Sequence, residues 1–175
     1  MRRSTGTTLI WKFVLFLLAG RISSAQDLAS PLNVTLCDLY EHPGDYTGKM
    51  IKVRGGSVGN ELRIEDILHD ARSRPCSAYM RIIVVFPDHV KPIPGFDLLQ
   101  DAALKKLEEA LNHSGPIHID ATYAGRFDAV FAWRDHQRVR VGQGSEPGFG
   151  KKHEYDARIV LREVSDVWAE PLPHK

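Results

Sequence analysis

The sequence predicts a mostly β fold with one or two helices, arranged as a small five-stranded OB-like barrel behind a short N-terminal helix. Three observations lead to this prediction. The elements follow the order short helix, three strands, longer helix, two strands. Gly55 and Gly56 stand inside the first strand, where glycines often mark a bend. Residues 79–86 are apolar almost throughout, as in a strand buried on both faces. A different small α+β sheet with the same elements is the alternative.

The first 25 residues have the pattern of a secretory signal peptide. A basic start at Arg2 and Arg3 precedes a short apolar run at residues 13–20, and Ser23 and Ala25 supply the small residues that a signal peptidase requires. We expect cleavage between residues 25 and 26 and a secreted or periplasmic protein. The apolar run is about half of the ~20 residues that a spanning helix needs, which disfavours a membrane anchor. No later stretch of the sequence is apolar enough to span a membrane, so we expect no membrane span after cleavage. An uncleaved membrane anchor is the alternative.

The remaining chain is expected to form a single domain at residues 34–170, between a loose lead at 26–33 and a polar tail at 171–175. The apolar content of 43% and charged content of 26% in the whole sequence are typical of globular proteins. Signal cleavage removes four of the 23 basic residues and no acidic one, so 19 basic residues face 22 acidic ones and the net charge becomes −3. This charge disfavours a protein that binds duplex nucleic acid.

The first elements of the domain are indicated by short apolar patterns. Thr35 is the expected N-cap of a short helix. Its apolar face consists of Leu36, Leu39 and Tyr40. Residues 50–58 alternate between apolar and charged side chains, which predicts the first strand, and residues 61–67 predict the second.

The second half of the domain begins with the longest helix. Residues 97–112 carry an apolar stripe, with Asp97 as the expected cap and Gln100 three positions later. Strict alternation predicts a strand from residue 117 that continues to about residue 133, and residues 154–164 predict the last strand.

Cys37 and Cys76 both lie after the expected cleavage site. Two thiols in an exported domain favour a disulfide, which we predict between them. Two separate buried thiols are the alternative.

Two stretches resemble a known group of proteins. Residues 36–56, "LCDLYEHPGDYTGKMIKVRGG", and residues 148–167, which include "YDARIVLREVSDV", resemble the corresponding segments of exported bacterial OB-fold-like proteins of unknown function. The resemblance implies an OB-type fold and an exported location. It carries over no catalytic residue.

No catalytic or metal-binding motif is present. The sequence contains neither a phosphate-binding loop nor a Gly-x-Ser-x-Gly elbow. The closest metal-like pair is His118 with Asp120 on one strand face, and two ligands do not make a site. His153, Asp156 and Ser145 are near in sequence but lack any sign of an oxyanion hole. We therefore predict no catalytic residue, no metal and no cofactor.

Basic and aromatic residues are interleaved within residues 125–152. Between Arg134 and Lys152 five basic residues face two acidic ones, a local charge of +3. Guanidinium groups hold anions bidentately and aromatic rings stack on sugars or bases. The predicted ligand-binding residues are Arg126, Trp133, Arg134, Arg138, Arg140, Phe149, Lys151 and Lys152.

These features predict a secreted or periplasmic binding module that contacts an anionic glycan or a protein of the cell envelope. Three alternatives stay open. The protein could be an enzyme acting on an envelope polymer through unidentified residues, or a structural envelope protein. The basic segment could also be a hairpin whose aromatic side chains pack on the domain while its arginines are solvated.

Overall fold

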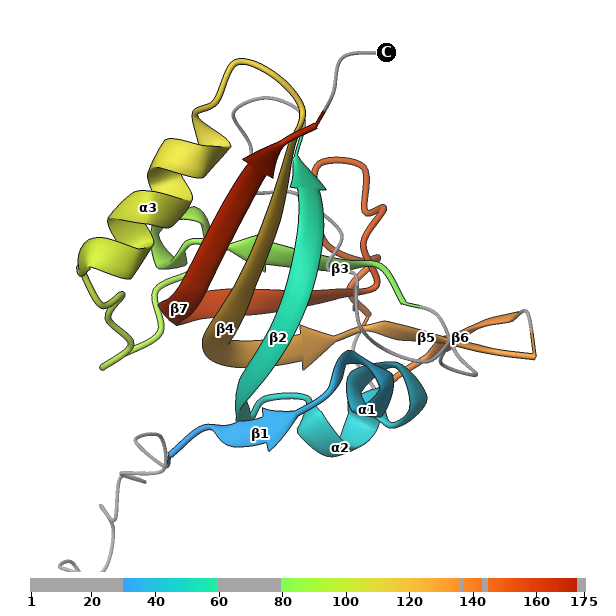
Figure 1. Cartoon of the computed structure of the whole chain (residues 1–175). Coiled ribbons are helices and arrows are strands. Elements are labelled where there is room, and N and C mark those ends of the chain that lie inside the picture. Colours follow the sequence, from blue (N-terminus) through green and yellow to red (C-terminus); the bar gives the residue numbers. More distant parts are fainter. Residues whose placement is uncertain (1–29, 60–79, 136, 143–144, 173–175) are drawn as a thin grey trace, which may run out of the picture.

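The computed structural model describes residues 30–59, 80–135, 137–142 and 145–172 (Figure 1). Its strands are β1 (Leu32–Val34), β2 (Met50–Gly59), β3 (Ile82–Val85), β4 (Ile117–Ala129), β5 (Phe131–Arg134), β6 (Gln137–Arg140) and β7 (Ala157–Pro171). Its α-helices are α1 (Leu36–Glu41), α2 (Pro43–Tyr46) and α3 (Ala102–Leu111), and a 3-10 turn, η1, spans Pro87–His89.

The described strands form a mixed, open sheet rather than a closed barrel. Five strands lie in the order β1-β2-β4-β7-β3, with parallel pairs β1–β2 and β3–β7, and β5–β6 form a separate hairpin. The prediction of a closed five-stranded OB-like barrel is therefore wrong. The class is mixed α/β, and the strand predicted at residues 61–67 lies outside the described part of the chain.

The predicted position of the bulge in the sheet is also wrong. Gly55 and Gly56 make no bulge, because β2 pairs with β4 from Met50–Arg126 to Gly59–Ile117 without a shift of register. The irregularities lie between β4 and β7 instead. The bulges of this sheet thus lie in the last strand and not in the first long one.

Gly125 marks the corner at which β4 turns. Ala124 pairs with Glu163 and Gly125 with Leu161, so Arg162 is an extra residue in β7. A Cβ on Gly125 would lie 2.2 Å from the carbonyl oxygen of Val160. In Figure 1 both β4 and β7 change direction along their length, so their two halves run at an angle to each other. This corner needs glycine because the backbones approach too closely for any side chain.

The helix α1 begins as predicted. The Thr35 side chain accepts a hydrogen bond from the Asp38 N–H at 3.1 Å, while the Thr35 N–H and hydroxyl both donate to Asp38 Oδ2 at 2.8 Å. These bonds, first from the backbone and then from the hydroxyl of Thr35, lower the pKa of the Asp38 carboxyl below its ordinary value of 3.8. The reciprocal cap fixes the direction in which α1 leaves β1.

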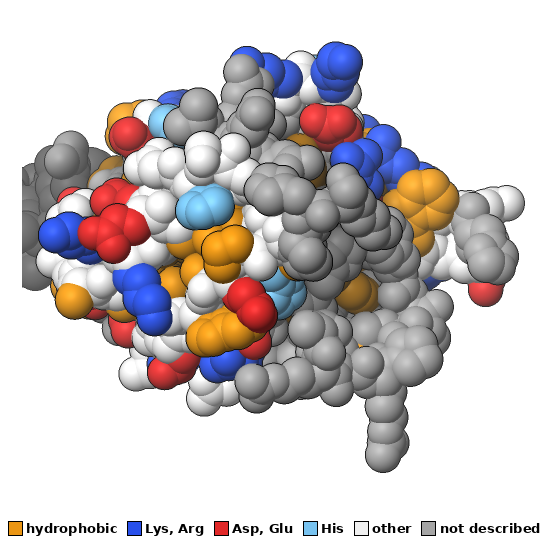
Figure 2. Space-filling model, turned by 45° about the horizontal axis from the view of Figure 1, so that its top comes forward, with side chains coloured by type: hydrophobic (Ala, Val, Ile, Leu, Met, Phe, Trp, Pro, Cys, Tyr) orange, Lys and Arg blue, Asp and Glu red, His pale blue; other side chains and the backbone are white. Residues whose placement is uncertain are grey.

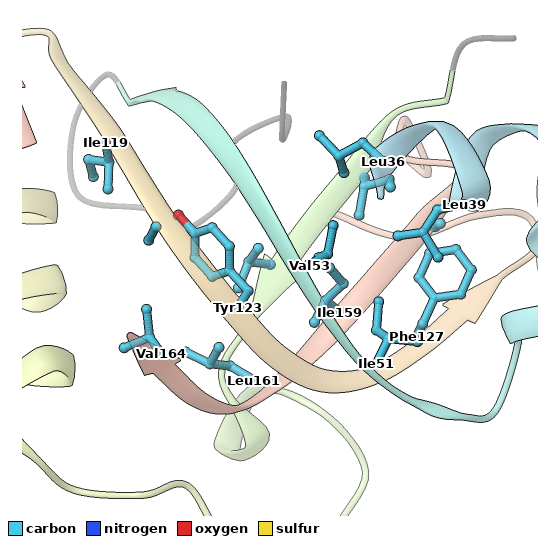
Figure 3. Packing of buried hydrophobic residues seen from close by; sticks show 14 of the residues in the cluster. Leu36, Leu39, Ile51, Val53, Ile119, Tyr123, Phe127, Ile159, Leu161 and Val164 are labelled. Atoms are coloured by element: carbon cyan, nitrogen blue, oxygen red, sulfur yellow. The ribbon is translucent and has the colours of Figure 1, made fainter. Parts of the chain in front are cut away.

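The main core lies between α1, α3 and the concave side of the sheet. Figure 3 shows Leu39 of α1 beside Phe127 of β4 and Ile51 of β2. At the other end of the same cluster, Leu104 and Leu107 of α3 are buried with Ile119 and Val164.

Two predicted boundaries are wrong for identifiable reasons. The long helix begins at Ala102 with Asp101 as its cap, because the Leu99 N–H donates to the Arg162 carbonyl at 2.7 Å and holds the preceding segment extended. The lead at residues 26–33, predicted to be loose, contains Leu32, which lies in β1 and pairs with Ile51 of β2. Both errors arise from contacts with residues distant in sequence.

Replacing Gly125 by Ala should lower the free energy of unfolding by at least about 2 kcal/mol, because the new methyl group would collide with backbone that cannot rotate away. Urea denaturation followed by circular dichroism measures the change. Gly44→Ala is the matched control, since its Cβ would lie 3.8 Å from Val141 Cγ1, an ordinary contact. A similar stability for both variants would contradict the account of the corner.

Thr35→Ala should raise the pKa of Asp38 only part of the way towards its ordinary value, because it removes the hydroxyl bond but keeps the larger effect of the Thr35 N–H. Thr35→Ser should leave this pKa low because the hydroxyl is kept. Since folding lowers this pKa, the carboxylate stabilises α1 above the unfolded-state pKa, and this contribution is lost as the pH falls through the folded-state pKa. An NMR titration of the carboxyl carbon measures the shift. Equal titration curves for wild type and Thr35→Ala would refute the capping account.

Candidate ligand-binding surface

The predicted basic segment forms a hairpin that projects from the sheet (Figure 1). In its register Phe131 faces Arg140 and Trp133 faces Arg138, so these four side chains share one face. Asp135 takes a positive φ of 49° in the connection. The hairpin interpretation of this segment is confirmed.

A buried carboxylate, Asp156, lies under this face of the hairpin. Its side chain is 2% exposed. Oδ1 accepts a hydrogen bond from Arg138 Nε at 2.7 Å, and Oδ2 accepts bonds from Trp133 Nε1 and the Arg81 N–H, each at 3.1 Å. A buried carboxylate requires such compensation, since the loss of hydration is otherwise uncompensated. Arg138 is exposed, as expected for a solvated arginine, but its Nε is held by Asp156, which the sequence did not predict.

The backbone of Asp156 joins the same elements. Its N–H donates to the Arg81 carbonyl at 2.9 Å, and its carbonyl accepts from the N–H groups of Val130 and Phe131 at 2.9 and 3.2 Å. These bonds explain why the strand predicted to run from 117 to 133 is interrupted at Val130. One residue thus fixes the base of the hairpin to the chain just before β3.

A second carboxylate, Asp128, holds two further arginines. Arg126 Nε donates to its Oδ1 and Arg158 Nε to its Oδ2, both at 3.0 Å. Asp128 and Arg158 are direct cross-strand partners on β4 and β7. Arg126 therefore lies in a separate ion-pair group from the predicted residues of the hairpin.

Four arginines lie over aromatic rings, and we call this set the arginine surface. Arg138 and Arg140 lie over Phe131, with 3.8 and 4.8 Å from guanidinium carbon to ring centroid. Arg158 lies 4.6 Å from the Phe149 centroid and Arg81 lies 5.1 Å from that of Tyr155. The three rings belong to one small apolar cluster, which also contains Ile83, Val85 and Val130.

A tight turn beside the arginine surface presents Lys151 and Lys152 to solvent. Phe149 and Tyr155 pair across its base. Gly150 has a φ of 79°, and a Cβ there would lie 2.7 Å from Tyr155 Cδ2. The turn therefore needs glycine, and both lysines are exposed at its tip.

The structure brings together only part of the predicted set. Trp133, Arg138, Arg140 and Phe149 belong to the surface around Asp156 and the apolar cluster. Arg134 is exposed on the opposite face of the hairpin. The residues of this surface that the sequence did not predict as ligand-binding are Arg81, Asp128, Phe131, Tyr155, Asp156 and Arg158. Phe131 stands among the aromatic residues of the basic segment, and "YDARIV" places Asp156 next to an apolar strand, but neither pattern revealed the partners.

The other pairs singled out in the sequence form no catalytic or metal site among the described residues. Asp156 is bound to Arg138 and Trp133, while His153 Nδ1 lies 3.3 Å from the Gly148 carbonyl oxygen. Asp120 pairs with Arg54 at 3.2 Å. In the described ranges no group of three or more His, Cys, Asp or Glu side chains is placed to hold a metal ion.

Two further predictions concern the export of the chain. Cys37 lies on α1, and its predicted partner Cys76 lies outside the described residues, so the bridge stays a prediction. No helix within the described part of the chain is both long and apolar enough to span a bilayer.

Comparison of the chain with protein families, with curated proteins and with solved structures finds no match in any of the three. The resemblance to exported OB-fold-like proteins stays a prediction. The described geometry defines a small mixed α/β domain with an arginine-rich, aromatic-backed surface.

Asp156→Ala should lower the free energy of unfolding by about 1–3 kcal/mol, because it leaves the Trp133 indole N–H and the Arg81 backbone N–H without their acceptor. Arg134→Ala, on the exposed face of the same hairpin, should change stability by no more than about 0.5 kcal/mol. Chemical denaturation of both variants makes the comparison. If Asp156→Ala were as stable as Arg134→Ala, the buried carboxylate would not organise this region.

Proposed function

We propose that this protein is an exported binding module whose arginine surface binds an anionic glycan. The observation that carries the proposal is the stacking of Arg81, Arg138, Arg140 and Arg158 on the rings of one apolar cluster. Four guanidinium groups on one apolar base can contact several acidic groups of a polymer. The exported location rests on the N-terminal sequence pattern.

The stacked arginines are suited to binding because their orientation is already restricted. Arg138 is held at Nε by Asp156 and on one face by Phe131, and its side chain stays 34% exposed, so a ligand can reach it. A flexible arginine loses side-chain entropy on binding, whereas a fixed one loses less. Carboxylate and sulfate groups both match the planar fork of donors.

Electrostatics favour the same surface over the rest of the protein. The segment from Arg134 to Lys152 carries +3, whereas the chain without its signal carries −3. A local positive field on an acidic protein directs anionic ligands to one place. Figure 2 shows Lys and Arg side chains gathered on the side from which the hairpin projects.

An enzyme with these carboxylates as acid and base is less well supported. Asp128 and Asp156 are both occupied by arginine donors, with Nε–oxygen distances of 2.7 to 3.0 Å. General acid–base catalysis requires a carboxyl within reach of the substrate's proton. These two groups act as supports for the arginines instead.

Replacing Arg140, Lys151 and Lys152 together by Gln should weaken binding to a heparin oligosaccharide roughly tenfold, about 1.4 kcal/mol. The triple variant should also leave immobilised heparin at lower salt than wild type, because three cations of the surface and its adjoining turn are removed. The melting temperature should change little. The matched control replaces Lys91, Lys105 and Lys106, three exposed lysines elsewhere, by Gln.

An equal loss of affinity in both triple variants would show that binding follows net charge alone. Absence of wild-type retention at low salt would refute the proposed function. A weakly acidic carboxymethyl resin run in parallel separates glycan binding from simple cation exchange.

A further inference from the structure

Trp168, near the end of β7, is distinct from every other described aromatic side chain. It is 48% exposed, whereas the other described aromatic residues are buried or half-buried. It lies outside the arginine surface, opposite Asp120 of β4. A single exposed apolar side chain is common on protein surfaces. What distinguishes Trp168 is the local structure that holds its ring outward.

A β-bulge directs this ring outward. Thr122 pairs with Ser165 and Asp120 with Trp168, so β7 has one residue more than β4 in this interval. With uninterrupted pairing from Ser165, Trp168 would stand opposite Ile119, whose side chain is in the core. The extra residue is accommodated by Asp166, a non-glycine residue with a φ of 52°.

Side-chain bonds hold the bulge in place. Asp166 Oδ2 accepts a hydrogen bond from Thr122 Oγ1 at 3.2 Å and from Ser165 Oγ at 3.3 Å. Backbone strain of this kind persists only where the surroundings compensate for it, and bulges often redirect a side chain at a functional site. The local structure is therefore organised to expose Trp168.

The neighbours of Trp168 are polar and ordered. The His118 ring meets the indole edge to face, with centroids 5.9 Å apart and planes at 67°. Asp120 faces Trp168 across the strand pair and binds Arg54 at 3.2 Å, and Glu170 lies opposite His118. A flat aromatic face thus stands among groups that donate and accept hydrogen bonds.

We propose that Trp168 is a stacking platform for a neutral sugar ring with equatorial hydroxyl groups. Such a ring presents a flat face of C–H groups to the indole, while its hydroxyls lie at the rim, on the side of the strand pair that carries His118 and Glu170. The site needs no charge on the ligand. It is separate from the arginine surface and does not depend on the function proposed for that surface.

A protein partner fits this area less well. A stable protein interface requires a contiguous apolar core several hundred Å² in size. The other exposed large apolar residues, Leu32, Leu99 and Val139, belong to β1, the segment before α3 and β6.

The test uses the chain without its signal peptide and a panel of cellohexaose, chitohexaose and maltohexaose. Trp133 and Trp168 are then the two tryptophans, so a nitrogen–proton NMR spectrum shows two indole signals. Cellohexaose or chitohexaose should shift the Trp168 signal and leave that of Trp133, which donates to Asp156, unchanged. Trp168→Phe assigns the signals.

Trp168→Ala should weaken binding of the same hexasaccharide by at least about tenfold, as expected for the loss of one stacked ring. Leu99→Ala removes a comparably exposed apolar side chain and should have no effect. Added salt and the triple variant at Arg140, Lys151 and Lys152 should also have no effect, which separates this site from the arginine surface. No binding by any of the three sugars, or a wild-type dimer that Trp168→Ala dissociates, would overturn the proposal.

Discussion

The buried carboxylate of Asp156 is the interaction on which the hairpin and the arginine surface depend. It accepts from Arg138, Trp133 and the Arg81 backbone, while its own peptide groups bond the base of the hairpin and the chain before β3. A buried ion pair adds little net stability compared with a well-packed apolar pair, yet its loss is costly because the partner is left unpaired. Its effect here is to fix one geometry, with the Arg138 guanidinium over the Phe131 ring at the surface of the domain.

The last strand has a comparable role in the sheet. The extra residues Arg162 and Asp166 divide β7 into segments whose inward and outward positions are reset. Arg162 lies opposite the corner at Gly125. Asp166 directs the Val167 side chain into the core and the Trp168 side chain out of it. A single long strand therefore lies in the core, holds Arg158 at the arginine surface and exposes an indole at its far end.

Local patterns were sufficient for part of this structure. The cap at Thr35, the alternation of β2 and the hairpin at Arg138 and Arg140 are set by neighbours in sequence, and they could be predicted. The open sheet, the strand β1 and the start of α3 depend on distant pairings such as Leu99 with Arg162. The role of Asp156 was hidden for the same reason, because its partner Arg81 is 75 residues away. The sequence pattern located the basic segment but could not show which arginines are held and which are solvated.

The most direct test of the account compares the heparin affinity of wild type with that of Asp156→Asn, under conditions where both proteins are folded. The substitution keeps the shape of the side chain but removes one negative charge from beneath the arginine surface. If charge alone governed binding, the variant would bind more tightly, since its net charge is more positive. If Asp156 acts by fixing the Arg138 guanidinium on Phe131, the variant binds more weakly and its affinity is less sensitive to Arg138→Lys. Weaker binding is the result that we predict, and tighter binding would contradict the account.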